Sequence, residues 1–254
     1  ISVTTVDEIN SSKEHYIAVG KDAIAKGKVG AVLLAGGMGT RLGSDKPKGV
    51  FDIGITRHVY IFERLIENLM DAVNETGSYV HLFVMTSEKN NTDTIEFFKE
   101  KDYFGYPCDY IHFFVQDMAP ASDYEGRFLM ESKSRIATSP NGNGGWYLSL
   151  KKAGYDKIIA GAGIEWLNVF AVDNVLQRIA DPVFVGALIE QQAAVGSKVV
   201  RKVAPDEKVG VMCLEDNRPS IIEYYELTDE LMNTLDEKGE RVYNFGVILN
   251  YLFR

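Results

Sequence analysis

The stretch LLAGGMGTRLGSDKPKG, from Leu33 to Gly49, combines five glycines with one arginine and two lysines. Glycines let several backbone N–H groups point at phosphate oxygens, because no Cβ stands in the way. Arg41 offers a planar fork for two phosphate oxygens, and Lys48 offers a compact positive charge just after the stiff Pro47. The chemistry of such a loop is polyanion binding, so the stretch predicts a site for the phosphates of a nucleoside triphosphate.

Two other glycine loops fit this stretch less well. The dinucleotide fingerprint G-x-G-x-x-G is met by Gly37 and Gly39, but its third glycine falls one position late, at Gly43. Glu63, at the spacing of the acidic residue that accompanies this fingerprint, lies inside a predicted helix. The phosphate-binding P-loop needs a lysine where Ser44 stands. A plain structural turn would leave the clustered cations unexplained, so a nicotinamide-dependent oxidoreductase and a simple turn are both disfavoured.

The composition narrows the class of protein. The chain has 254 residues, 46% of them hydrophobic, a net charge of −9 and a sequence pI of about 5.0, which suits one large domain with a substantial core. It has no basic stripe for nucleic acid and no apolar run near the ~18 residues of a membrane span. Cys108 and Cys213 form no disulfide or metal pattern, so we expect a cytoplasmic protein. From its first residue, Ile1, and its last residues, we expect a part of a longer chain.

Strand and helix patterns alternate around the glycine loop. Apolar runs predict strands at 31–35, 79–85, 109–115, 166–172, 197–203, 209–214 and 220–227, the last two paired around the turn DNRP. Helical spacing and start signals predict helices at 61–73, 92–99, 146–153 and 182–194. Asp93 and Glu96 have the spacing of a capping box. Residues 128–138 indicate a hairpin or irregular excursion, and 241–249 are ambiguous.

This alternation predicts the α/β class, with a mostly parallel sheet between helices. In such sheets the ligand lies beyond the carboxyl ends of the strands. Four loops follow predicted strands or precede predicted helices at that edge, namely 36–49, 116–120, 140–145 and 173–174. We therefore expect these four loops to converge on one cleft.

Six blocks occur along the chain in one order: LAGGMGTRLGSDKPKG, FFVQDMAPA, SPNGNGGWY, VFAVDNVLQRIADPVFVG, VGVMCLEDNRPSIIEYYEL and VYNFGVILNYLF. Together they resemble the eukaryotic-type UDP-sugar pyrophosphorylases, especially the UDP-N-acetylhexosamine pyrophosphorylases, from about Lys28 to the last residue. The resemblance implies a Rossmann-like, GT-A-like nucleotidyltransferase core with a mostly parallel mixed sheet. It implies an N-terminal helical segment at 1–27 and the catalytic core at 28–254, without the family's C-terminal part.

The resemblance also implies a reaction, in which UTP and a sugar 1-phosphate give a UDP-sugar and pyrophosphate. The sugar phosphate attacks the α-phosphate in line, so catalysis is alignment and charge neutralisation, with Mg²⁺ as cofactor. By their match to the family, Arg41 should grip the β- and γ-phosphates and Lys48 the α-phosphate. Asp173 should bind Mg²⁺, because a carboxylate at a strand's carboxyl end can reach such an ion; a helix N-cap is its alternative role.

The base and the sugar are assigned to further residues by the same resemblance. Gln116 should read uracil, since its amide offers one donor and one acceptor to the imide edge. The implied nucleotide-binding residues are Leu34, Ala35, Gly36, Gly37, Gly39, Gln116, Gly142 and Asn143, and the implied sugar-binding residues are Gly210, Glu223 and Asn244. The four histidines have no ligand spacing and are expected to be structural.

Two departures from the family leave the sugar open. Val247 stands where the family often has an asparagine that helps to read the sugar, and residues 55–62 replace a family loop that carries proline and serine. The family's second lysine belongs to the C-terminal region that this chain lacks. The sequence thus favours UDP-N-acetylglucosamine as product, with UDP-glucose and a non-catalytic nucleotide-sugar-binding protein as alternatives. It does not indicate an oligomeric state.

Overall fold

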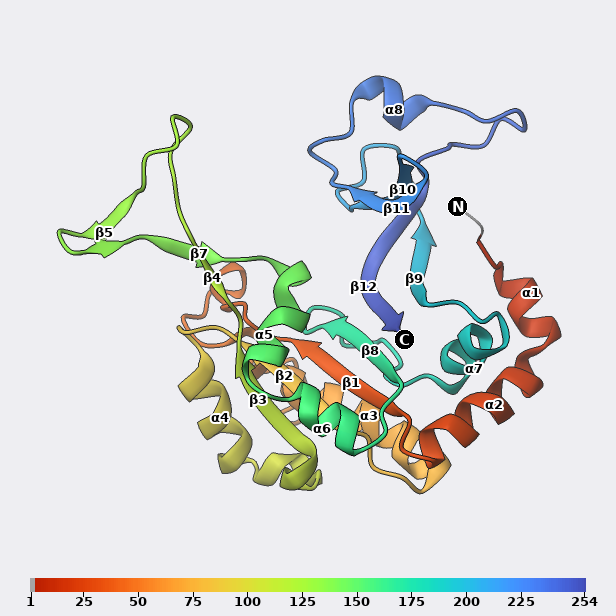
Figure 1. Cartoon of the computed structure of the whole chain (residues 1–254), viewed down its shortest axis with the longest axis horizontal. Coiled ribbons are helices and arrows are strands. Elements are labelled where there is room, and N and C mark those ends of the chain that lie inside the picture. Colours follow the sequence, from red (N-terminus) through yellow and green to blue (C-terminus); the bar gives the residue numbers. More distant parts are fainter. Residues whose placement is uncertain (1–2) are drawn as a thin grey trace.

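The structure is a computed structural model that describes residues 3–254 (Figure 1). Its strands are β1 (Val29–Leu34), β2 (Leu82–Thr86), β3 (Ile111–Val115), β4 (Met118–Pro120), β5 (Met130–Ser132), β6 (Arg135–Ile136), β7 (Thr138–Pro140), β8 (Trp166–Ala171), β9 (Val195–Arg201), β10 (Val211–Glu215), β11 (Arg218–Ile222) and β12 (Phe245–Phe253). Its α-helices are α1 (Val6–Ser11), α2 (Lys13–Ala25), α3 (Ile61–Thr76), α4 (Asn91–Glu100), α5 (Trp146–Lys152), α6 (Asp156–Gly161), α7 (Pro182–Glu190) and α8 (Asp229–Asn233).

One eight-stranded sheet organises these elements, in the order β11-β10-β12-β8-β1-β2-β3, with β9 paired to β12. The strands β8, β1, β2 and β3 run parallel to one another, while β12 runs antiparallel to β8, β9 and β10. The sheet is therefore mixed, with a parallel half and an antiparallel half. The predicted α/β class and a mixed sheet are confirmed. The sheet is less parallel than expected, because among the described residues three of its strand pairs are parallel and four are antiparallel.

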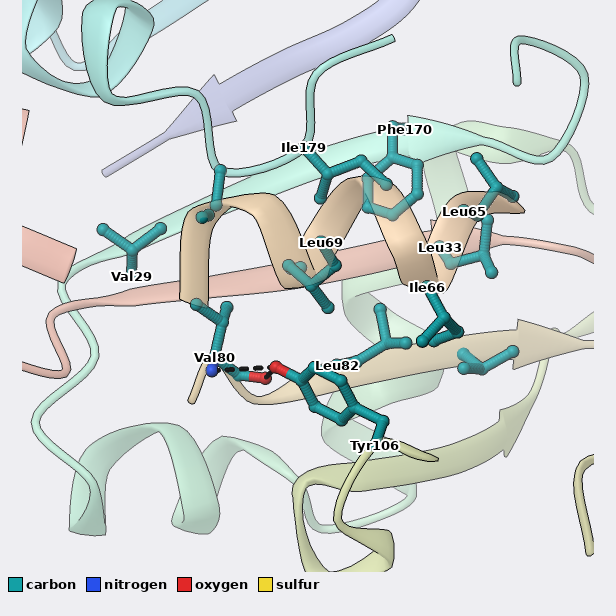
Figure 2. Close-up of a cluster of buried hydrophobic side chains, with 14 of the residues drawn as sticks. Val29, Leu33, Leu65, Ile66, Leu69, Val80, Leu82, Tyr106, Phe170 and Ile179 are labelled. Carbon is teal, nitrogen blue, oxygen red and sulfur yellow. Dashed lines mark hydrogen bonds between the residues drawn. The ribbon is translucent and has the colours of Figure 1, made fainter. Parts of the chain in front are cut away.

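Strand β1 is central because both of its faces are covered. All six of its residues are buried. Its side chains alternate between two cores: Leu33 packs in the core on the α3 side, and Val32 packs in the core that contains Trp146 and Leu150 of α5. Figure 2 shows the first of these cores, with Leu65, Ile66 and Leu69 of α3 above β1 and β2.

Helix α3 forms because its sequence carries both an apolar stripe and end signals. The carboxylate of Glu63 accepts a hydrogen bond from the Tyr60 N–H at 3.1 Å, which satisfies one free donor at the helix start. The helix ends at Gly77, whose φ of 71° is the left-handed conformation that glycine adopts without strain. Helix α3 packs against β1 and β2, the strands that lead into the predicted ligand-binding edge of the sheet.

Several predicted boundaries differ from the structure, and three of them have a physical reason or a consequence. Helix α4 begins at Asn91, and the Asn90 side chain before it binds the loops rather than the helix, so the predicted capping box of Asp93 and Glu96 is wrong. Helix α7 ends at Glu190 instead of 194, just before Gln192 takes a φ of 52°. The second strand of the DNRP hairpin ends at Ile222, and the ambiguous region before residue 249 is part of the long strand β12.

Residues 118–140 form an arm outside the main sheet, as the predicted excursion at 128–138 implies. At its base β4 pairs with β7, and farther out β5 pairs with β6. Figure 1 shows this arm projecting away from the helices. Its base lies between Gln116 and Gly142, so it joins two candidate nucleotide loops.

The N-terminal helices pack closely against the rest of the chain. A Cβ on Gly20 of α2 would lie 1.9 Å from the Pro182 carbonyl oxygen, and one on Gly186 of α7 would lie 1.9 Å from the Tyr16 carbonyl oxygen. The two helices can cross this closely only because glycines stand at the contact. The boundary between residues 27 and 28 stays a prediction. In the part of the chain from residue 3 onward, no helix combines the length and the apolar character needed to cross a bilayer.

Candidate functional site

Lys48 and Asp173 meet at the carboxyl edge of the parallel strands. Lys48 begins a short 3₁₀ turn after the glycine loop, and Asp173 follows β8 by two residues. Although 125 residues separate them in sequence, the Lys48 ammonium and the Asp173 carboxylate form an ion pair. The loops 36–49 and 173–174 therefore converge, as expected from the strand order.

The surroundings of Lys48 favour an added anion. Burial lowers the pKa of Lys48, and the nearby positive charge of Arg41 lowers it further. The Lys48 side chain is 25% exposed and that of Asp173 is 56% exposed, so the carboxylate is the more open to solvent of the two. Two cations close enough to disfavour each other are stabilised by a phosphate placed between them.

Gln116 packs directly on the glycine loop. A Cβ on Gly36 would lie 2.4 Å from the Gln116 Nε2 atom, so this amide occupies the space that a side chain at position 36 would need. The Gln116 side chain is buried, and its backbone N–H donates to the Thr86 carbonyl at 2.8 Å. The backbone of the loop at Gly36 and the side-chain amide of Gln116 thus lie next to each other.

Asn90 contacts the glycine loop through its side chain, and no sequence motif marks this residue. Its Nδ2 donates to the carbonyls of Ala35 at 3.0 Å and Gly37 at 3.2 Å, and its Oδ1 accepts from the Ser87 N–H at 2.8 Å. The available signal was its position just after a buried strand, where polar side chains meet the neighbouring loops. Asn90 therefore fixes the path of the loop through two of its carbonyls, and its side chain accepts no hydrogen bond from the N–H groups of the loop.

Gly142 and Asn143 lie at the other foot of the arm from Gln116. The Asn141 N–H donates to the Asp117 carbonyl at 3.0 Å, which ties the two feet together. Gly142 has a φ of 78°, so only a residue without a Cβ fits there easily. Gln116 directly precedes Asp117 in sequence, and Asn143 lies two residues after Asn141. The hydrogen bond between Asn141 and Asp117 therefore keeps the segments that carry Gln116 and Asn143 together.

The three predicted sugar residues lie around the start of β12. A Cβ on Gly210 would lie 3.4 Å from Glu223 Oε2, so these two are in contact, and Val247 is equally close. Asn244 is buried, and its Oδ1 has no hydrogen-bond partner within residues 3–254. Because β12 runs antiparallel to β8, the first residues of β12 lie at the same edge of the sheet as Asp173, which follows the end of β8.

The structure gives no direct contact between this group and the pair Lys48–Asp173 within its described part. The two groups share an edge of one sheet, on β12 and on the turn after β8. Tyr251 on β12 is partly buried, and this burial raises its pKa, with a smaller contribution from the Glu223 charge.

The surroundings of Asp173 fit a magnesium ion that is shared with a substrate. Among residues 3–254 no three His, Cys, Asp or Glu side chains gather as a metal cage. Mg²⁺ often takes only one or two carboxylates and completes its shell with phosphates and water. A half-exposed carboxylate that lies beside Lys48 suits that role. The alternative N-cap role is wrong, because the next helix is capped by Asp181, which accepts from the Val183 N–H at 3.2 Å.

The histidines have partners of other kinds. His15 lies 3.1 Å from Glu190, and His58 contacts Asp52. The Nδ1 of His81 and the Nε2 of His112 are 2.9 Å apart at the other end of the sheet. Their contacts agree with the expectation that the histidines are structural.

The chain is similar to several known proteins over nearly its whole length. It is 39% identical over 236 residues to mouse UDP-N-acetylhexosamine pyrophosphorylase-like protein 1, covering 91% of this chain and 46% of the relative. It is 38% identical over 249 residues to the UDP-N-acetylglucosamine pyrophosphorylase of Saccharomyces cerevisiae, covering 96% and 52%. The chain spans about half the length of the curated relatives it matches.

A solved structure extends the likeness to the fold. The UDP-N-acetylglucosamine pyrophosphorylase of Trypanosoma brucei, solved with an inhibitor, superposes with a TM-score of 0.88 at 34% identity. That match covers 99% of this chain and 52% of the other. The sequence profile of the UTP–glucose-1-phosphate uridylyltransferase family matches residues 2–251. The chain therefore belongs to the UTP–glucose-1-phosphate uridylyltransferase family.

Proposed function

We propose that the full-length protein joins UTP to N-acetylglucosamine 1-phosphate, releasing pyrophosphate and forming UDP-N-acetylglucosamine. The observation that carries this proposal is the meeting of Lys48 with Asp173, beside Arg41, at the glycine-loop edge of the sheet. Cations and a lone carboxylate at one edge suit a triphosphate and its magnesium ion.

The reaction needs alignment more than it needs a nucleophile from the protein. An oxygen of the sugar phosphate attacks the α-phosphorus of UTP, and the bond from that phosphorus to the bridging oxygen of pyrophosphate breaks. Lys48 neutralises charge on the α-phosphate and Arg41 holds the departing β- and γ-phosphates. Bound Mg²⁺ on Asp173 would supply further charge neutralisation at the phosphate oxygens.

The ion pair of Lys48 and Asp173 has a consequence for this scheme. Without nucleotide, each group neutralises the other. Lys48 must leave the carboxylate to reach a phosphate, which also frees Asp173. The depressed pKa of Lys48 favours this exchange, because a phosphate brings more negative charge to it than one carboxylate does.

Uridine and the sugar are assigned to the two sides of the site. Gln116, resting on Gly36, presents its amide to the uracil edge. Glu223, Gly210 and Asn244 receive the sugar, and Gly210 and Glu223 lie close together. The relatives named for N-acetylglucosamine or N-acetylhexosamine, at 38–39% identity, support N-acetylglucosamine over glucose.

Pyrophosphate release from a panel of sugar 1-phosphates tests the proposal. The full-length protein is mixed with UTP, Mg²⁺ and each sugar phosphate in turn, and release is expected to be fastest with N-acetylglucosamine 1-phosphate. Faster release with glucose 1-phosphate would reassign the sugar and keep the reaction. Absence of release across the panel, with UDP-sugar still bound, would instead indicate a non-catalytic binder.

A further inference from the structure

A chain of buried amide side chains lies behind the turn that carries Asp173. Asn168 on β8 donates to Asn250 Oδ1 at 2.9 Å, and Asn250 on β12 donates to Gln177 Oε1 at 3.2 Å. Gln177 in turn donates through Nε2 to the carbonyl of Ala171, the last residue of β8, at 2.9 Å. All three amides are at most 6% exposed, so these bonds form away from water, where they are strong and costly to lose.

Helix α3 holds the same turn from another direction. Asn68 donates through Nδ2 to the carbonyls of Val175 at 2.8 Å and Gln177 at 3.1 Å. On the opposite side, the Val172 N–H continues the ladder toward β1 at 3.2 Å. Asp173 therefore lies between a residue fixed to the sheet and a residue fixed to α3.

Gln177 is the member of this network that belongs to the turn itself. Its side chain spans six residues back to Ala171 and closes the segment 172–176 into a short loop. A buried carbonyl needs a donor, and an apolar side chain at position 177 would leave both the Ala171 carbonyl and the Asn250 amide without this partner. The turn could then open while the sheet stayed intact.

We propose that Gln177 is a positioning residue that keeps the turn 172–176 closed so that Asp173 faces Lys48. The proposal rests on the function proposed above for Asp173, since the value of the fixed carboxylate lies in meeting the metal and the triphosphate. The side chain of Gln177 bonds to the Ala171 carbonyl and to Asn250, and not to the Asp173 carboxylate. Its effect passes through the backbone of the turn to the carboxylate.

Two measurements on Gln177→Met of the full-length protein test this role. Amide hydrogen exchange of residues 172–176 is expected to be faster, with exchange across the glycine loop 36–49 unchanged. The Mg²⁺ concentration for half-maximal pyrophosphate release should rise roughly 10- to 100-fold, as when a residue that orients a metal ligand is lost. The KM for the sugar 1-phosphate should stay unchanged. Asn68→Leu, which removes two bonds from the other side of the turn, should act in the same direction.

Tyr106→Phe provides the matched control. It deletes a buried pair of hydrogen bonds to Val80, at 2.9 and 2.7 Å, before the amino end of β2 and away from the site (Figure 2). It should lower stability and leave the Mg²⁺ dependence unchanged. The proposal is overturned when Gln177→Met exchanges like the wild type at 172–176, or when Tyr106→Phe shifts the Mg²⁺ dependence as far. A wild-type protein that releases no pyrophosphate would refute the proposed function, while the exchange measurement would still decide whether Gln177 closes the turn.

Discussion

At the residue scale, Gln116 is the side chain that we propose to select the base. Its amide rests on Gly36, so truncation removes the edge contact without opening the sheet. Gln116→Ala should reduce the preference for UTP over CTP, because the lost donor and acceptor are what distinguish the two pyrimidines. The ratio of kcat/KM for UTP and CTP measures this. An unchanged ratio would remove Gln116 from base recognition.

Lys48 is the residue expected to act in the transition state. Lys48→Ala should lower turnover on the order of a hundredfold or more, as when one charge-stabilising group is lost, while UTP binding survives. Lys46→Ala is the matched control, because Lys46 carries the same charge two residues away but is exposed. Turnover and UTP affinity are measured on both variants. Normal turnover in Lys48→Ala would exclude the assigned role.

At the element scale, the pairing of β2 with β3 carries a pH-sensitive contact. His112 on β3 and His81 before β2 are stacked among aromatic rings, and burial followed by the His81 charge lowers the pKa of His112 to about 4. Burial also lowers the pKa of His81. The unfolded chain therefore binds protons at higher pH than the folded chain, so this contribution to stability is present above about pH 6.5 and is lost as pH falls toward 4.

The free energy of unfolding, measured by urea titration between pH 7.5 and 4, checks this effect. The wild type should lose stability over that range more steeply than His112→Phe, which keeps a ring in the stack and removes the titrating group. Equal slopes for the two proteins would mean that the histidine pair does not contribute.

The crossing of α2 and α7 provides a second test at this scale. A Cβ at Gly186 would meet the Tyr16 carbonyl, so Gly186→Ala should destabilise the protein by about 1–3 kcal/mol through forced backbone movement. Gly161→Ala, at the end of α6, is the matched control, since no atom lies within 4 Å of its added Cβ among the described residues. Thermal unfolding should separate the two variants, and equal stability would argue against a tight crossing.

At the scale of the whole molecule, the parallel strands and the DNRP hairpin are readable from the sequence, whereas the long antiparallel strand β12 is not. Strand β1 is an unbroken apolar run because both of its faces are buried. Helix α3 has an apolar stripe because only one of its faces is buried against the sheet. Strand β12 shows no such pattern, because its pairing is irregular. It pairs with β8, β9 and β10, and its register with β9 shifts between Val247 and Tyr251. Leu249, inside this shift, has a φ of 51°.

The candidate site divides in the same way. The glycine loop with its cations, and the expectation that loops at one sheet edge converge, follow from local sequence and strand direction. The supporting amides Asn90, Asn168 and Gln177 do not, because each binds backbone groups or amides that only the folded chain brings within reach. In the sequence alone, nothing distinguishes these three amide side chains from other polar residues of strands and turns.

The most direct test of the central claim is a double-mutant cycle on Lys48 and Asp173, read as the rate of pyrophosphate release from UTP and N-acetylglucosamine 1-phosphate. If the two residues serve one triphosphate, Lys48→Ala and Asp173→Asn together should cost less than the product of their separate losses. Lys46→Ala combined with Asp173→Asn should be multiplicative. Multiplicative losses for Lys48 and Asp173, or wild-type rates in either single variant, would contradict a shared catalytic site.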